Sequence, residues 1–174
     1  MTRSFLIACV LALGTTIACD APWAGPALPA GGHWLSFSTV SYEGPRVVTN
    51  AILAANSTAE LESRVPDQSC PAPCWGQLQA DKPGLLYLAV ATIPDGCSET
   101  TIKERTAIAG RTLYFIHWVG ARSGTRCGAA FDERWRLLSV SRSELPEAGT
   151  LTVRLQRQGS NPYAIAAESQ VTLS

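Results

Sequence analysis

The pattern of apolar and polar positions along this chain is mostly that of β-strands. In TLTVRLQ, Leu151, Val153 and Leu155 alternate with polar residues, which predicts a strand that buries one face. The segments 84–93 and 111–119 are apolar at successive positions, so both faces of these strands should be covered. Further strands are predicted at 33–41, 46–55, 100–108, 135–141 and 163–173.

One segment carries the signals of a helix. Ser57 is followed three residues later by Glu60, the spacing of a capping box, in which the Ser side chain accepts from the third backbone amide and the Glu side chain reaches back. Because Pro66 should end this helix, we expect it near 57–65. A second helical turn at 143–147 contains a proline, which favours an ordinary turn there.

Seven or eight short strands, separated by turns that contain Gly or Pro, predict an all-β fold with one short helix. Two architectures fit this pattern, a β-sandwich and an open barrel. At 174 residues the chain is long enough for one sizeable core and too short for two domains to be expected.

The first residues have the pattern of an export signal. Arg3 precedes an apolar or small stretch, Phe5 to Ala18, whose length suits a signal peptide and falls short of the ~20 residues of a membrane span. We expect residues 1–18 to be removed. The next segment, 19–32, is rich in Pro and Gly and is predicted to be a flexible tether, with a single β-rich domain at 33–174.

The residues Thr16, Ile17, Ala18 and Cys19 resemble the end of a bacterial lipoprotein signal, although position 16 usually holds Leu in that family. The resemblance covers residues 1–19 only. It implies that Cys19 becomes the amino terminus, is lipidated, and holds the protein to a membrane outside the cytosol. The alternative is an ordinary secreted or periplasmic protein in which Cys19 is free in its tail.

The number of cysteines agrees with lipidation. Once Cys9 leaves with the signal, five cysteines remain, and one thiol would be left over in an oxidising compartment. Lipidation of Cys19 removes the odd one. The other four cysteines, which suffice for two disulfides, are Cys70, Cys74, Cys97 and Cys127.

One pairing of these cysteines follows from a predicted strand order. If 84–93, 100–108 and 111–119 form an up-down-up meander, Cys97 and Cys127 leave the sheet at the same end and a disulfide between them is geometrically easy. Cys70 and Cys74 would then pair across a tight loop; two other pairings of the four stay open.

Metal ions and cofactors are not expected. A zinc site needs four ligands, and beside the thiols only His33 and His117 are available. No catalytic residue is predicted either, because no familiar catalytic or phosphate-binding motif occurs. His117 lies in the middle of an apolar strand and should be a buried, hydrogen-bonded core residue.

Two segments are candidate binding sites. Trp75 follows the predicted small disulfide loop directly, where it either presents its indole to a partner or packs over the bridge. In GARSGTRCG, Arg122, Arg126 and backbone amides are able to cradle a carboxylate or phosphate, although a hairpin loop held by a disulfide explains the glycines equally well.

Charge and motifs together favour a binding protein. Lys and Arg balance Asp and Glu at 14 each, so net charge suggests no nucleic acid partner. The sequence therefore predicts a lipid-anchored, extracytoplasmic β-domain, a non-catalytic binding or structural module of the cell envelope whose partner is an envelope protein or a glycan. The alternative is a small secreted hydrolase or transferase with an unrecognised active site.

Overall fold

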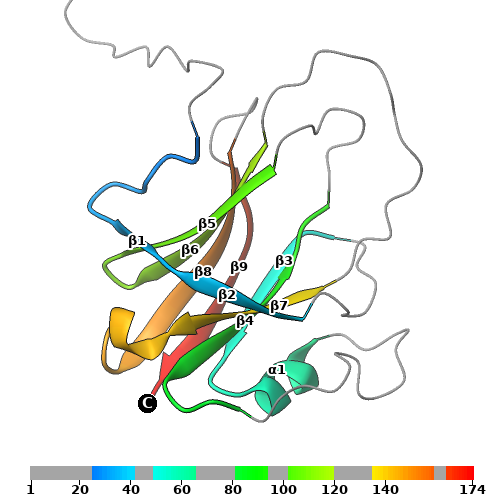
Figure 1. Cartoon of the computed structure of the whole chain (residues 1–174), viewed down its shortest axis with the longest axis vertical. Helices are drawn as coiled ribbons and strands as arrows, with labels where there is room; N and C mark the ends of the chain where they lie inside the picture. The colour runs from blue at the N-terminus through cyan, green and yellow to red at the C-terminus, as the bar shows by residue number, and fades with distance from the viewer. Residues whose placement is uncertain (1–24, 42–48, 66–80, 94–101, 120–134, 159–163) are drawn as a thin grey trace, which may run out of the picture.

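The computed structural model describes residues 25–41, 49–65, 81–93, 102–119, 135–158 and 164–174 (Figure 1). In these residues nine strands form two sheets, one of five strands and one of four, which pack face to face. The all-β class with one short helix is confirmed, and of the two expected architectures, sandwich and open barrel, the structure is the sandwich, with nine strands in the described ranges where seven or eight were expected.

The five-stranded sheet has the order β1-β5-β6-β8-β9. Neighbours in this sheet are antiparallel except β6 and β8, which run parallel. Gly110, with φ 57°, makes the expected turn between β5 and β6. The strands are β1 (His33–Leu35), β5 (Ile102–Ala109), β6 (Thr112–Val119), β8 (Gly149–Gln158) and β9 (Ala164–Leu173).

The four-stranded sheet has the order β2-β7-β4-β3 and is antiparallel throughout. A short 3-10 helix, η2 (Arg142–Glu144), follows β7, in the segment where a turn was expected. The strands are β2 (Phe37–Ser41), β3 (Ala51–Ala55), β4 (Leu85–Ala91) and β7 (Arg136–Ser141).

The segment 33–41 is two strands where the sequence predicts one. β1 pairs with β5 through His33 and Ile108, whereas β2 pairs with β7 through Phe37 and Val140. The chain therefore passes from one sheet to the other at Ser36, at one edge of the sandwich. Alternation continues through such a crossing, so the sequence pattern does not reveal it.

The predicted meander of three strands is wrong in its first member. β5 and β6 form the expected hairpin, but β4 lies in the other sheet, between β7 and β3. β4 and β6 are both apolar on two faces, and this property says only that a strand is central, not to which sheet it belongs.

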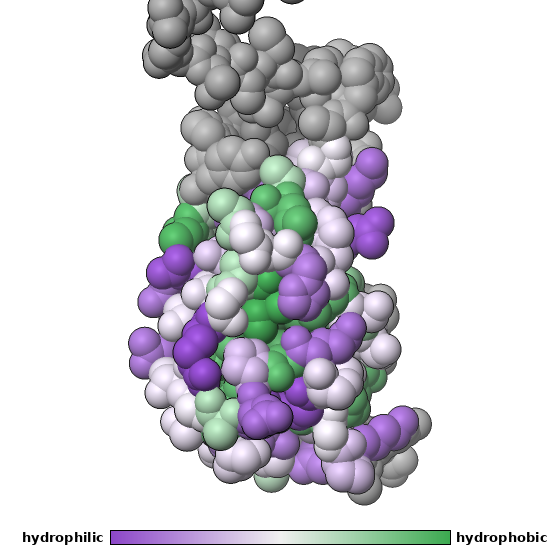
Figure 2. Space-filling view, turned by 90° about the vertical axis from the view of Figure 1, so that its left-hand side faces the viewer, coloured by the Kyte–Doolittle hydropathy of each residue, from purple (hydrophilic) through white to green (hydrophobic). Residues whose placement is uncertain are grey.

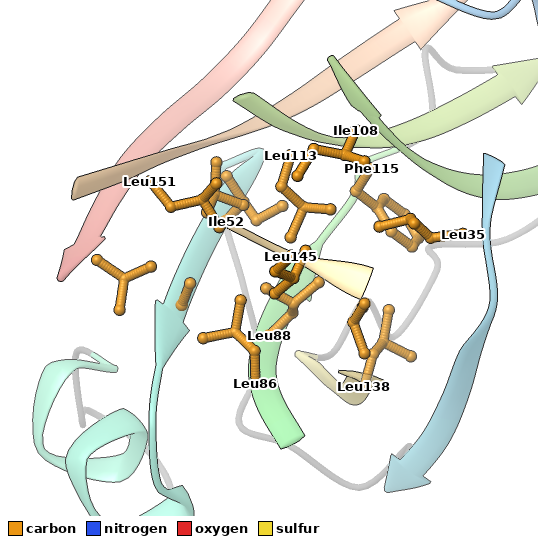
Figure 3. Packing of buried hydrophobic residues seen from close by; sticks show 14 of the residues in the cluster. Leu35, Ile52, Leu86, Leu88, Ile108, Leu113, Phe115, Leu138, Leu145 and Leu151 are labelled. Atoms are coloured by element: carbon orange, nitrogen blue, oxygen red, sulfur yellow. The ribbon is translucent and has the colours of Figure 1, made fainter. Parts of the chain in front are cut away.

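The interior lies between the two sheets and is filled by apolar side chains from both (Figure 3). Leu113 and Phe115 of β6 face Leu86 and Leu88 of β4 across this space, and all four are fully buried. Burial of one such side chain contributes about 1.5–3 kcal/mol. The packing of the two inner faces therefore supplies most of the stability of the fold.

The outer face of the four-stranded sheet is covered in part by α1 (Thr58–Arg64). Leu61 of this helix packs with Tyr87, Trp135 and Leu137 in a second buried cluster. β4 is thus covered on both faces, as the unbroken apolar run predicts.

The ends of α1 confirm the predicted helix signals. The Ser57 hydroxyl accepts from the Glu60 amide at 3.1 Å, and the Glu60 carboxylate accepts from the Asn56 amide at 3.1 Å. The helix ends at Arg64, and Val65 is already extended, with ψ 124°, as expected for a residue before proline.

The edge of β9 is tied to the other sheet by the same region. Asn56 donates to the Thr172 carbonyl at 2.9 Å, and Arg64 donates to the Gln170 carbonyl at 3.4 Å. Side chains thereby satisfy backbone acceptors that an edge strand would otherwise present to solvent.

The N-terminal segment contacts the five-stranded sheet before β1 begins. The Ala27 amide donates to the Gln158 side chain at 2.6 Å, and that side chain donates back to the Ala27 carbonyl at 3.0 Å. Of the predicted tether 19–32, residues from 25 onward are described, and they lie along the left side of the molecule in Figure 1.

Candidate functional site

The apolar interior ends in a cluster of charged side chains at one end of the sandwich. Along β6 the core positions Leu113 and Phe115 are followed two residues later by His117. Glu104 of β5 lies opposite His117 in the register, and Arg136 begins β7 on the same inner face as Leu138. Since side chains alternate between faces, these three charged or polar groups point into the space between the sheets.

These three side chains form one connected network with the Thr92 hydroxyl, and we call the four residues the Glu104 cluster: Thr92, Glu104, His117 and Arg136. His117 Nδ1 lies 3.1 Å from Glu104 Oε1. Arg136 donates to both oxygens of the same carboxylate, at 2.6 Å each, and lies 3.5 Å from the Thr92 hydroxyl. A bidentate guanidinium–carboxylate pair is strong and geometrically specific, so it fixes the position of the carboxylate.

The electrostatics of the cluster keep Glu104 ionised. Burial by itself would raise the pKa of this carboxyl, but hydrogen bonds from His117 and Arg136 and the positive charge beside it lower the pKa from 4.5 to about 2. At neutral pH the carboxylate is therefore an acceptor only, and His117 Nδ1 must carry the proton that it shares with Glu104.

His117 has one ring nitrogen that the described residues leave without a partner. Its side chain is 3% exposed, and Nε2 is buried with no hydrogen-bond donor or acceptor among them. The sequence predicted a buried, hydrogen-bonded histidine, and this is confirmed for Nδ1 alone. Nε2 lies on the other side of the ring from Nδ1 and is directed away from Glu104.

A carboxylate that orients a histidine through Nδ1 prepares Nε2 for three kinds of chemistry. Nε2 is able to accept a hydrogen bond from a ligand, to remove a proton as a general base, or to coordinate a metal ion. Within the described ranges, no group of three or more His, Cys, Asp or Glu side chains is placed to hold a metal ion.

Several strand ends meet around this cluster. Arg157 lies opposite His117 in the register of β8 and β6, and it donates to the Ile93 carbonyl just after β4, at 3.0 Å. The ends of β4, β6 and β8 and the starts of β5 and β7 are therefore at the same end of the sandwich, and the connections 94–101 and 120–134 begin and end there.

The residues predicted from the sequence to bind a ligand or to be modified lie outside the described part of the chain. This holds for Trp75, for Arg122 and Arg126 of the Gly-rich segment, and for Cys19. It also holds for the four cysteines predicted to form disulfides, Cys70, Cys74, Cys97 and Cys127. Their roles and pairing stay predictions.

Sequence reasoning missed Glu104 and Arg136 as site residues. A signal was present, because alternation places Glu104 on one face with Thr106 and Ile108, and Arg136 on one face with Leu138. A charged residue in register with a core face is a candidate for a buried ion pair. Which charges meet depends on how the two sheets stack, and this is not encoded in either strand alone.

Comparisons with protein-family models, with curated proteins and with solved structures found no match. No helix in the described ranges has the length and apolar character needed to cross a bilayer.

Proposed function

We propose that this chain is an exported protein, lipid-anchored at Cys19, that acts as a non-catalytic binding module of the cell envelope. Its binding end is the one that carries the Glu104 cluster. The lipoprotein-like signal and the odd number of cysteines support the anchor and an extracytoplasmic location. The position of the cluster supports the choice of end, because connections between strands gather there.

The observation that carries the proposed binding role is the buried Nε2 of His117. Among the described residues Nε2 has no partner, and a buried polar atom in that state costs about 1–3 kcal/mol, which a hydrogen bond to a ligand would recover. Glycans present many hydroxyl donors, and peptide amides present N–H donors. We therefore propose a glycan or an envelope protein as the partner.

We also propose that two disulfides stabilise the module. Cys97 and Cys127 belong to the connections 94–101 and 120–134, which start at the same end of the sandwich, so a Cys97–Cys127 bridge needs no crossing of the molecule. Cys70 and Cys74 are close enough in sequence to close a tight loop. Peptide mapping without reduction tests both bridges, and Cys70 or Cys74 joined to either of the others would contradict the pairing.

The binding role is tested by the nitrogen signals of the two histidines. The domain is labelled with 15N, and envelope glycan fragments are titrated while the imidazole resonances are followed. We expect the Nε2 resonance of His117 to shift on binding, and the signals of His33, on β1, to serve as the control. Shifts at His33 alone, or at neither ring with any fragment, would contradict glycan binding at the cluster. Crosslinking in the native host then identifies a protein partner.

The anchor is tested separately. In membranes washed at high salt, which weakens binding by surface charge, Cys19→Ser should move the protein from the membrane fraction to the soluble fraction, and intact-mass measurement of the wild-type protein should show acyl chains. Membrane retention that does not change in Cys19→Ser would count against acylation.

A second candidate function, hydrolysis or group transfer, is favoured by the contact between Glu104 and His117. A carboxylate-oriented imidazole whose Nε2 has no partner among the described residues has the arrangement of a general base. This role requires a hydroxyl, thiol or water within hydrogen-bond reach of Nε2. Turnover of ester, amide or glycoside substrates that is abolished by His117→Ala and strongly reduced by Glu104→Gln would establish the enzyme over the binding module.

A further inference from the structure

The outer face of the five-stranded sheet has cations and apolar groups in adjacent rows. Lys103 lies opposite Trp118, and its ammonium is 5.4 Å from the centre of the indole ring. In the next row, Arg105 lies opposite Ile116 of β6, which is fully buried, and exposed Ile165 of β9 is placed on the same face by its pairing with Gln156.

Most of the exposed large apolar side chains lie on this side of the molecule, on the N-terminal segment and on the two edge strands β1 and β9. Among the described residues four such side chains are exposed, and three of them belong here: Leu28 at 41%, Trp34 at 40% and Ile165 at 52%. Leu28 follows Ala27, which is bonded to Gln158 of this sheet, and Trp34 lies opposite Ala107. The fourth, Val40, is on β2 of the other sheet.

Figure 2 shows the side of the molecule along which the N-terminal segment runs, and in the middle of this view apolar side chains are visible between polar ones. Single apolar side chains on a surface need no explanation, but several together mark a region of contact.

The charge of the outer face is positive. Its described charged side chains are Lys103, Arg105, Arg154 and Glu168, three cations against one acid. The acid is already paired, with Glu168 Oε2 2.6 Å from Arg154 Nε. Glu104 points to the opposite, inner face. The face therefore complements an anionic surface, although the whole chain has no net charge.

The length of the preceding chain restricts where this face lies. Ala27 is held by Gln158 at the end of β8, and Cys19 is eight residues earlier. A fully extended chain of that length reaches at most about 28 Å. With acyl chains on Cys19, the end of the outer face at Gln158 therefore stays within about 28 Å of the bilayer surface.

We infer that the outer face of the five-stranded sheet docks on the anionic headgroup surface of the membrane to which Cys19 is anchored. Leu28, Trp34 and Ile165 contact the boundary between headgroups and acyl chains, while Lys103 and Arg105 lie against lipid phosphates. This inference rests on the proposed anchor. It adds an orientation, in which the membrane lies along one sheet and the Glu104 cluster stays between the sheets.

The test uses a form without acyl chains, so that the affinity of the face itself is measured. The mature Cys19→Ser chain is sedimented with vesicles of phosphatidylglycerol and phosphatidylcholine, and with vesicles of phosphatidylcholine alone, at about 50 mM salt, where surface charges are weakly screened. We expect binding to the anionic vesicles that is weaker at higher salt.

Two variants change the face, and each has a matched control on another part of the surface. K103E/R105E should lower the partition coefficient on anionic vesicles roughly tenfold or more, whereas K82E, an exposed lysine before β4, should have a much smaller effect. I165D should lower binding several-fold, whereas V40D on β2 should not. Thermal melting checks that each variant is folded.

The outcomes separate this inference from the anchor. Absence of binding to anionic vesicles, equal binding to both kinds of vesicle, or equal effects of the paired variants would overturn the docking face even if mass measurement shows acyl chains on wild-type Cys19. An unmodified Cys19 with the expected vesicle results would instead remove the anchor and leave the membrane-binding face.

Discussion

Glu104 and Arg136 belong to opposite sheets and form a bidentate ion pair across the interior, with two nitrogen–oxygen distances of 2.6 Å. The pair closes the polar end of the core, where the Arg136 guanidinium also lies 5.9 Å from the Phe115 ring centre. Because both side chains are mostly buried, each depends on the other for compensation of its charge.

Removal of Arg136 should therefore destabilise the fold strongly. Arg136→Ala leaves the Glu104 carboxylate buried with His117 as its only remaining partner in the cluster, and we expect a loss of about 3 kcal/mol in the free energy of unfolding. Urea denaturation measures it. The matched control is Arg154→Ala, which breaks the exposed pair with Glu168 and should cost about 0–1 kcal/mol. Equal losses for the two variants would contradict the role given to the buried pair.

The same carboxylate should make stability depend on acid pH. The folded pKa of Glu104 is about 2 and its ordinary value is 4.5, so between these values the unfolded state binds more protons. The contribution of Glu104, about 3 kcal/mol, is present above pH 4.5 and is lost as the pH falls toward 2. In unfolding measurements across this range, Glu104→Gln should show a shallower decline than the wild type, and Glu168→Gln should follow the wild-type curve. Parallel curves for wild type and Glu104→Gln would refute the assignment.

The Gln158 side chain makes two hydrogen bonds to Ala27 in the N-terminal segment. Gln158→Ala removes both hydrogen bonds to Ala27 and should cost about 1–2 kcal/mol. Hydrogen exchange at the Ala27 amide should become faster, and protease cleavage within 25–32 should increase. Gln170→Ala, at an exposed position of β9, is the control and should leave both unchanged. Unaltered protection of Ala27 in Gln158→Ala would show that other contacts hold the segment.

Substitutions of Gly110, in the turn between β5 and β6, should destabilise the fold to the extent that the new residue disfavours a positive φ. Its φ is 57° and a Cβ there would meet nothing within 4 Å, so only backbone strain matters. Gly110→Ala should cost about 1 kcal/mol, Gly110→Asn less, and Gly110→Val more, because Asn visits this region readily and β-branched residues do not. Urea denaturation ranks the three, and a Val variant as stable as the Asn variant would contradict this account.

Much of the local structure was predictable because it depends on near neighbours. The alternation in β8 places Leu151, Val153 and Leu155 in the core, and the capping residues Ser57 and Glu60 begin α1 where expected. The number of strands and their pairing could not be predicted in the same way. The crossing at Ser36 and the place of β4 depend on contacts between segments far apart in the chain.

The Glu104 cluster illustrates the same limit. The sequence placed His117 in a buried strand, and the alternation puts Glu104 on the same face as Ile108, but Arg136 comes from a strand more than thirty residues away and from the other sheet. A charge at a core position is costly alone and stable when paired, and the identity of its partner is a property of the stacking.

By itself, the sequence determined the β-class of the fold, the single short helix, the half-buried and fully buried strands, and the chemistry available at each position, because these follow from side-chain periodicity and local hydrogen bonds. Only the tertiary structure decided which strands share a sheet, which charges meet at the end of the core, and where the N-terminal segment attaches. These relationships depend on how two faces pack together, and many pairings of similar apolar faces satisfy the same pattern along the chain.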